Sequence, residues 1–361
     1  MNYEAEHIRR IIQMEYHINQ LFNEFLSQVV PHLKRIKYGK RSVWALNPVI
    51  EKQIDQALQN FAIKYKDYLR SYMAQEWELS EEKNDSIFMK LLKGAGIIIA
   101  ADKLLKYFNR VNPTGKEVTI ENILSFPRGP ELMTAFIKNR LDKFISPRVW
   151  NLSGENKKIR LKTVQSGILE GRSAAKISQD LRQLLNNPDK RFRRVRDPET
   201  GKLKLSKPMA AYHPGTGVYR SSHQNALRLA RTETNMAYRR ADAERWQRTD
   251  FILGFEVKLS GSHVVTDICD DLKGKYPKQF TFIGWHSQCY CMAVPILPDR
   301  ESFIRYLKQD SIVQGKYIQT LPGKAINYIK NNNDKLLAMK NRPYWLRDNF
   351  KVKDNKIILN I

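Results

Sequence analysis

The sequence predicts a predominantly helical α+β protein: an N-terminal helical domain followed by a helical-plus-small-β module with a Cys/His-rich hairpin. Apolar residues recur at spacings of three and four through most of the N-terminal region, which is the pattern of amphipathic helices. Between Phe251 and Leu259 the apolar period falls to two, as in a half-buried strand. A second strand is expected over Tyr290–Leu297, and the three cysteines lie between the two strands or at the start of the second.

The helical domain is expected to cover residues 1–145. Its helices are predicted over residues 4–30, 47–76, 84–109 and 130–145. Pro31 is expected to end the first helix, because proline removes a backbone hydrogen bond and clashes with the preceding turn. The turn-forming stretches Asn112–Gly115 and Pro127–Pro130 separate the later helices. We find no catalytic constellation in this part of the sequence.

The second domain is expected over residues 146–299. Its helices are predicted over residues 154–169, 173–186 and 222–248. Between the first two, Gly171 suits the position just after a helix and Ser173 suits an N-cap. The remaining residues, 300–361, are expected to form a C-terminal helical basic tail, with helices over 300–308 and 323–340.

The second domain contains a loop, residues 187–221, with a dense run of basic side chains. They are Lys190, Arg191, Arg193, Arg194, Arg196, Lys202 and Lys204. A loop of this length inside a compact region is usually functional or disordered. Two interpretations stay open, an arm that contacts phosphates and an exposed charged insertion.

The whole chain is strongly basic. Its 361 residues include 62 Lys and Arg against 37 Asp and Glu, which gives a formal net charge of +25. Such a surplus favours a polyanionic partner. Nucleic acid is the first candidate, since neutralised phosphates release counterions. An anionic membrane surface, an acidic protein and a merely soluble basic surface are the alternatives.

The three cysteines are an odd and low number, which argues against a disulfide framework and favours a reducing compartment. Residues 1–17 carry charges throughout, so no signal peptide is expected. The longest apolar run, Gly94–Ala101, is far shorter than the roughly 20 residues of a membrane span. A buried helix segment is the better interpretation of that run.

The densest chemical constellation lies between residues 260 and 291. Thiolate and imidazole groups suit Zn²⁺, which takes four such ligands in a tetrahedron. The candidate ligands are Cys269, His286, Cys289 and Cys291, with His263 or Asp267 as substitutes. The gap from Cys269 to His286 matches no standard zinc-finger spacing. The alternative is a set of reduced cysteines that pack a small hairpin.

A second motif, Arg231 and Glu233, lies in the helix predicted over 222–248. Two residues apart on a helix, these side chains point in different directions. Each is therefore expected to bind a separate element. A structural ion pair is the more common role for such a buried charge, and a catalytic Glu233 is the alternative.

Taken in order, these motifs resemble the phage minor head proteins, the Mu protein F-like head morphogenesis family. The resemblance runs from about Trp150 to Leu297. Its pieces are Gly167–Gly171, the Ala230–Thr234 helix, Asp267-x-Cys269 with Leu272–Gly274, and His286-x2-Cys289-x-Cys291 with Val294–Pro295. Family members often carry a second cysteine after the first and an arginine between the last two. Here Asp270 and Asp271 follow Cys269, and Tyr290 stands between the last two cysteines.

The resemblance implies a virion protein of the capsid interior, present in few copies and associated with the portal. Such proteins are thought to act in head assembly, DNA packaging or ejection. Portal and capsid proteins and double-stranded DNA, bound without sequence specificity, are then the expected partners. The chain is expected in the virion interior, or in the host cytoplasm during assembly, with no membrane involved. No enzyme activity is expected.

Two enzyme classes are the main alternatives. A metal-dependent nuclease would use His263, Asp267 and His286 around its ion. An ADP-ribosyltransferase-like enzyme would need a Glu-x-Glu motif on a late strand. Glu4-Ala-Glu6 and Glu76-Trp-Glu78 have this spacing but lie in predicted helices. A sequence-specific DNA binder is not supported, because no helix-turn-helix or finger spacing is present.

Overall fold

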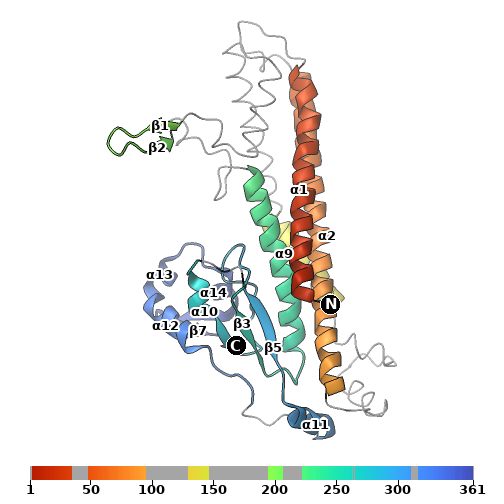
Figure 1. The fold of residues 1–361 in the computed structure, drawn as a ribbon, viewed down its shortest axis with the longest axis vertical. Coiled ribbons are helices and arrows are strands. Elements are labelled where there is room, and N and C mark those ends of the chain that lie inside the picture. Colours follow the sequence, from red (N-terminus) through yellow and green to blue (C-terminus); the bar gives the residue numbers. More distant parts are fainter. Residues whose placement is uncertain are drawn as a thin grey trace. The chain divides into compact units, whose positions relative to one another are not determined.

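The chain is predominantly helical with small antiparallel sheets, as the sequence predicts (Figure 1). The computed structural model describes residues 2–34, 48–94, 129–145, 194–205, 222–261, 263, 265–309 and 316–360. The predicted helices 154–169 and 173–186, and the basic residues Lys190, Arg191 and Arg193, lie outside these ranges.

The long helices come from the first two thirds of the chain, and short ones follow. The long and middle helices are α1 (Tyr3–Lys34), α2 (Pro48–Gly94), α5 (Pro130–Asn139) with a π-helical turn η2 (Arg140–Ile145), and α9 (Ser222–Gln247). The shorter helices are α10 (Ile268–Leu272), α11 (Arg300–Gln309), α12 (Gly323–Asn331), α13 (Asn333–Ala338) and α14 (Tyr344–Asn349).

The strands form three separate antiparallel sheets within the described ranges. The first is a hairpin of β1 (Arg194–Arg196) and β2 (Leu203–Leu205). In the second, β3 (Gly254–Lys258) lies between β4 (Gly274–Tyr276) and β5 (Met292–Ile296). The third is a hairpin of β6 (Phe350–Lys353) and β7 (Lys356–Leu359).

The chain divides into two compact units. Unit 1 comprises Met1–His7, Met73–Phe136 and Thr234–Ile361, and unit 2 comprises Ile8–Tyr72 and Ile137–Glu233. These units do not follow the consecutive ranges 1–145, 146–299 and 300–361 of the sequence prediction. The reason is that α1, α2 and α9 each supply residues to both units, so each core is built from segments far apart in the sequence.

The core of unit 2 is formed by the apolar faces of its helices, which pack against one another. On α1 and α2 the buried residues recur every three or four positions, as an amphipathic helix requires. They include Ile11, Met14, Ile18, Leu21, Phe22 and Phe25 on α1, and Ile54, Leu58, Phe61, Tyr65 and Leu69 on α2. The Tyr65 hydroxyl donates to the carbonyl of Ala226 on α9 at 2.6 Å, which ties a third helix to this core.

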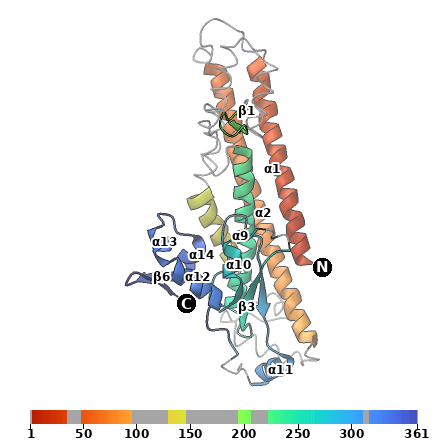
Figure 2. The ribbon, with the colours of Figure 1, turned by 60° about the vertical axis from the view of Figure 1, so that its left-hand side comes forward.

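Unit 1 is built around the three-stranded sheet and an aromatic core. Large buried side chains of this core come from α9, the sheet, the loop before β5, and α14. They are Trp246, Phe255, Tyr276, Phe280, Trp285 and Trp345. Two views place α12, α13 and α14 beside α10 (Figure 1 and Figure 2). The C-terminal segment is thus part of this core.

Several expectations for single elements are wrong. Pro31 does not end α1, which continues to Lys34, because so near the helix end proline removes only one of the last hydrogen bonds. The helices predicted over 47–76 and 84–109 are one helix, α2, as far as Gly94. Polar residues interrupt its apolar pattern, yet they are buried: Ser80 and Asn84 both donate to the Asp242 carboxylate of α9.

The predicted basic tail is also corrected. The helices predicted over 300–308 and 323–340 are confirmed as α11 and as the pair α12 and α13. The segment is not a separate tail, however, because Trp345 lies in the core and residues 350–359 form the β6–β7 hairpin. Asp354 and Asn355 both have positive φ, +50° and +55°, which is the backbone of a two-residue hairpin turn. Part of the predicted loop 187–221 likewise forms the β1–β2 hairpin.

Candidate metal centre

Cys269 is held at the start of α10 by a double cap. The Asp267 carboxylate accepts a hydrogen bond from the Cys269 backbone N–H at 2.7 Å, and the Asp270 carboxylate accepts one from the Asp267 N–H at 3.1 Å. This reciprocal arrangement is a capping box, which satisfies helix donors that otherwise lack partners. It fixes the backbone of Cys269, whose side chain is buried.

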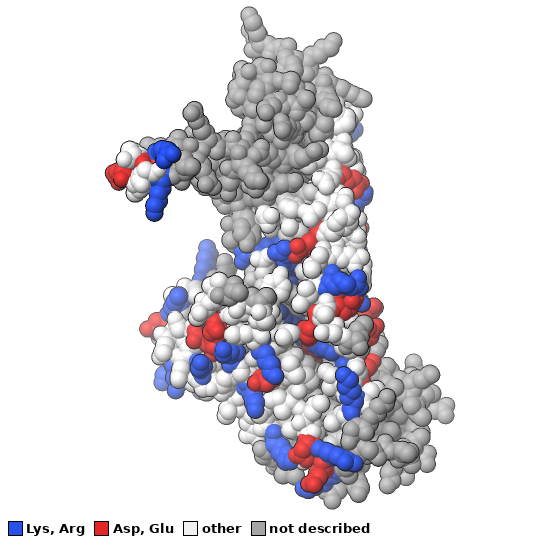
Figure 3. Space-filling model, in the orientation of Figure 1, with Lys and Arg blue, Asp and Glu red and all other residues white. Residues whose placement is uncertain are grey.

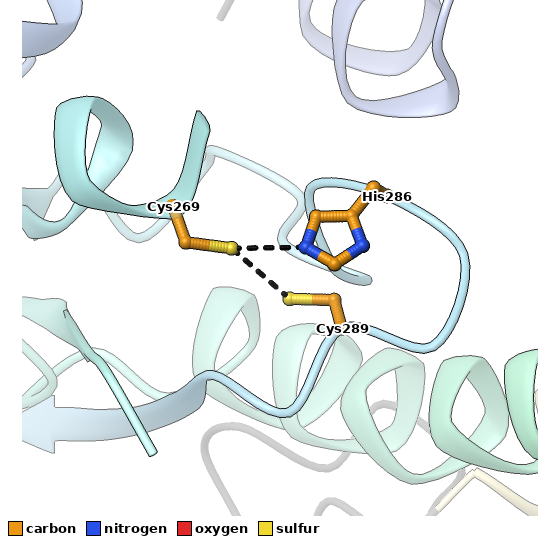
Figure 4. A group of neighbouring side chains, drawn as sticks. All are labelled: Cys269, His286 and Cys289. Carbon is orange, nitrogen blue, oxygen red and sulfur yellow. Dashed lines mark hydrogen bonds between the residues drawn. The ribbon is translucent and has the colours of Figure 1, made fainter. Parts of the chain in front are cut away.

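A tight loop before β5 brings His286 and Cys289 together. The Cys289 N–H donates to the His286 carbonyl at 3.2 Å, and Gln288 adopts a positive φ of +60° within this turn. The Sγ of Cys269 lies 3.2 Å from His286 Nε2 and 3.9 Å from the Sγ of Cys289. Figure 4 shows the three side chains converging from α10 and from this loop. These three ligand atoms lie close enough to hold one metal ion.

His286 is oriented with one nitrogen toward the cysteines. Its Nδ1 lies 2.8 Å from the Ser287 carbonyl, a group that only accepts, so Nδ1 carries the proton. Nε2 faces both the Cys269 thiol and the Asp267 carboxylate, each at 3.2 Å. A backbone hydrogen bond at Nδ1 is the outer contact that commonly orients a metal-binding histidine, and it leaves Nε2 as the nitrogen that a metal ion would take.

Two further sequence candidates are near the group. Cys291 is buried, and its thiol influences the ionisation of Cys269 and Cys289, although its Sγ does not join the group whose ligand atoms all lie within 4.8 Å of one another. The Asp267 carboxylate lies 3.2 Å from His286 Nε2. These two side chains are the candidates for a fourth position, and Asp267 is the more exposed of the two.

The clustered thiols shift one another's ionisation. Hydrogen bonds from the thiols of Cys269 and Cys291 hold the pKa of Cys289 well below its ordinary value, and the nearby Arg239 guanidinium lowers it further. Hydrogen bonds with Cys289 and Cys291, together with burial, raise the pKa of Cys269. Cys289 is therefore the thiol that ionises first, and a thiolate is the form that binds metals.

His263 belongs to a second group, with Asp267 and Asp270. Its Nε2 lies 2.9 Å from the Asp270 carboxylate and 3.9 Å from that of Asp267. The hydrogen bond with His263 lowers the pKa of Asp270. His263 thus pairs with a carboxylate of the capping box, and the group of Cys269, His286 and Cys289 forms without it.

The basic arm is described only in part. Arg194 lies on β1 and Lys204 on β2, while Lys202 precedes β2 and is exposed. Arg196 Nη1 donates to the Gly201 carbonyl at 3.2 Å across the hairpin turn. On the face drawn in Figure 3, blue Lys and Arg residues of the described chain are mixed with red Asp and Glu residues.

Arg231 and Glu233 bind different elements within unit 2. Arg231 donates from Nε to the Glu15 carboxylate of α1. Glu233 is fully buried and accepts two hydrogen bonds from Arg140 of η2, both at 2.7 Å. These are the separate contacts that their spacing on the helix predicts, and the geometry is that of structural ion pairs.

One residue near the metal group escapes the sequence analysis. Arg239 on α9 is buried and hydrogen-bonds to the backbone of the cysteine loop. An arginine in a helix usually faces solvent, so its type alone gives no signal. Its spacing from buried Asn235, Asp242 and Trp246 does place it on the same helix face.

Comparisons with protein-family models, with curated proteins and with solved structures find no match to this chain. Among the described helices, none combines the length and apolar character needed to cross a membrane.

Proposed function

We propose that the chain is a minor head protein of a phage or prophage, whose Cys/His module binds zinc as a structural staple. In this proposal it acts in head morphogenesis, associates with the portal and contacts double-stranded DNA without reading its sequence. The module supplies stability and not catalysis.

The donor set and its spacing support zinc. Zn–S and Zn–N bonds of about 2.3 and 2.0–2.1 Å in a tetrahedron separate two sulfurs by about 3.8 Å and a sulfur from a nitrogen by about 3.6 Å. The Sγ atoms of Cys269 and Cys289 are 3.9 Å apart, and Cys269 Sγ is 3.2 Å from His286 Nε2. Small shifts would accommodate the ion. Soft thiolate ligands select zinc over magnesium or calcium.

The observation that carries the proposal is the convergence of two of the ordered motifs, Asp267-x-Cys269 and His286-x2-Cys289, on one group of ligand atoms. The helix that contains Ala230–Thr234 continues as α9 to Arg239, which holds the cysteine loop. Asp267-x-Cys269 caps α10, and His286-x2-Cys289 supplies the facing ligands. Two of the four motifs on which the resemblance depends thus supply one Cys/His group, and this supports the proposal.

The charge supports DNA as a partner. A net charge of +25 costs self-repulsion, which phosphate neutralisation relieves. A protein enclosed with packaged DNA needs only sequence-blind phosphate contacts. Binding to random duplex DNA should therefore weaken as salt rises.

A gel shift on random duplex across salt tests the DNA contact, with a charge-reversal variant at Arg191, Arg193 and Arg194. We expect weaker binding and a slope of log K against log salt smaller by up to about three units, since each lost phosphate contact removes about 0.9. Reversal of Lys351, Lys353 and Lys356 on the exposed β6–β7 hairpin is the matched control, with the same change in charge. An unchanged slope in the first variant removes the arm from the proposal. An equal decrease of the salt slope in the two variants would mean that DNA contacts basic residues in several parts of the surface and not the arm in particular.

A metal-dependent nuclease is the second candidate, because His263, Asp267 and Asp270 form an oxygen-rich group beside the cysteines. Such an enzyme would degrade plasmid DNA with Mg²⁺ or Mn²⁺, and His263→Ala would abolish the cleavage. If the wild-type chain leaves DNA intact with either ion, this candidate is removed.

A further inference from the structure

Arg239 is a buried cation whose hydrogen bonds to the described residues all go to backbone carbonyls. The side chain is 6% exposed. Its Nη2 donates to the carbonyls of Cys289 at 2.5 Å and Cys291 at 2.9 Å, and its Nη1 donates to that of Ile283 at 3.4 Å. The guanidinium also lies over the ring of Phe282, 5.4 Å from its centre. It therefore clamps the two ends of the Cys289–Cys291 segment.

Gly284 leaves the room that this guanidinium occupies. A Cβ at position 284 would lie 2.6 Å from Arg239 Nη1, closer than real contacts allow, and the residue has a φ of +111°. The backbone conformation thus favours glycine there, and a side chain at this position would displace the guanidinium. The loop is shaped around the arginine, independently of any metal.

The charge of Arg239 has no carboxylate partner among the described residues. A buried charge is costly unless it is paired. Zinc with the thiolates of Cys269 and Cys289 and a neutral His286 sums to zero, so the guanidinium would stay uncompensated. One more thiolate makes the centre singly negative, and the cation then balances it.

We propose that Arg239 is the buried counter-charge and positioning residue of a three-thiolate zinc centre in which Cys291 is the fourth ligand. The inference rests on the proposed zinc centre and adds its ligand set and its counter-ion. Asp267 would balance the charge equally well. However, its side chain is 37% exposed and caps Cys269, whereas Arg239 binds the carbonyl of Cys291 itself.

The ligand set is tested on the zinc-loaded full chain by X-ray absorption, which separates sulfur neighbours at about 2.3 Å from nitrogen and oxygen at about 2.0–2.2 Å. We expect three sulfurs and one nitrogen, and two sulfurs in Cys291→Ser. Two sulfurs in the wild type would overturn the inference and leave the zinc centre standing. No bound zinc would overturn both.

The role of Arg239 is tested by competition for zinc with a chelator. Arg239→Gln should lower zinc affinity about 10- to 100-fold, the usual cost of losing an outer-shell partner. Arg239→Lys keeps the charge but loses the fork of two carbonyl bonds, so it should recover part of the affinity. The matched control is Arg240→Gln, which removes the same charge from a neighbouring residue paired with Glu244.

An Arg239→Gln chain with wild-type zinc affinity would overturn the role assigned to Arg239. If that variant does not fold, Gly284→Ala serves in its place, because the added methyl group displaces the guanidinium and leaves the charge. Gly284→Ala should also lower the zinc affinity. An unchanged zinc affinity in this variant would likewise contradict the role assigned to Arg239.

Discussion

Two buried arginines on α9, six positions apart, have opposite surroundings. Arg245 donates to the Glu81 carboxylate at 2.5 Å and to that of Asp85, both on α2. Arg239 binds three carbonyls and an aromatic ring. The first charge is neutralised by two carboxylates, and the second lies near the thiols of Cys289 and Cys291 without a carboxylate partner among the described residues. In the proposed zinc centre, a negative group of thiolates and metal takes the place that the carboxylates have around Arg245.

The largest loss of stability is expected when the side chain of Arg245 is removed. Arg245→Ala should destabilise the protein by about 3–5 kcal/mol, because it leaves the buried Glu81 carboxylate without its cation. Urea unfolding measures the loss. It should be the same with and without a chelator, and a loss that depends on zinc would mean that the two arginines are not independent.

Removal of zinc should have the next largest effect. With free zinc 1,000-fold above its dissociation constant, binding stabilises the folded chain by about 4 kcal/mol, and a chelator should remove this increment. Cys289→Ser should melt at a lower temperature than wild type in zinc, and the gap should shrink in the chelator. An unmoved melting temperature in zinc would mean that Cys289 is neither a ligand nor a stabilising core residue.

His223 lies at the end of α9 that belongs to unit 2, and its protonation provides a test that involves no metal. Burial lowers the pKa of His223, with Glu15 raising it and Arg231 lowering it. The imidazole ring packs edge-on against the ring of Phe22, with 4.9 Å between the two ring centres, and its Nε2 is hydrogen-bonded to Asn19. Because the unfolded state then binds the proton more readily, this histidine's contribution to stability is complete above its ordinary pKa of 6.5 and is lost as pH falls below it.

Unfolding measured across pH 5–8 checks this, with His223→Gln as the variant. The free energy of unfolding of the variant should fall less steeply than that of the wild type as the pH decreases below about 6.5. If both chains decline in parallel, His223 is not the group responsible.

The smallest effect is expected at the half-buried arginine next to Arg239. Arg240 lies 2.5 Å from Glu244, one helical turn away. Arg240→Gln should cost about 0.3–0.5 kcal/mol, the usual value of an ion pair between residues four positions apart on a helix. A larger loss by urea unfolding would disqualify it as a control for Arg239.

Much of the fold could be predicted from periodicity, and the failures have physical reasons. The predicted helix 222–248 and the predicted strand 290–297 match α9 and β5 closely. The single helix α2 was divided because Ser80 and Asn84 are polar at buried positions. The strand β4 has only three residues, too few for an alternating pattern to be recognised.

The candidate site could be predicted by residue type but not by geometry. Thiol and imidazole chemistry alone selects Cys269, His286 and Cys289. Their convergence depends on the helix cap at Asp267 and on the turn at Gln288. Neither of these local structures follows from the spacing of the cysteines and the histidine in the sequence. Arg239 could not be predicted, because only the folded loop shows that its partners are carbonyls.

Zinc content of the chain, purified without chelators and measured by elemental analysis, tests the central claim most directly. The account predicts about one zinc per chain in the wild type and much less in Cys269→Ser. A wild-type chain that is folded and contains no zinc, even after incubation with the ion, would contradict it.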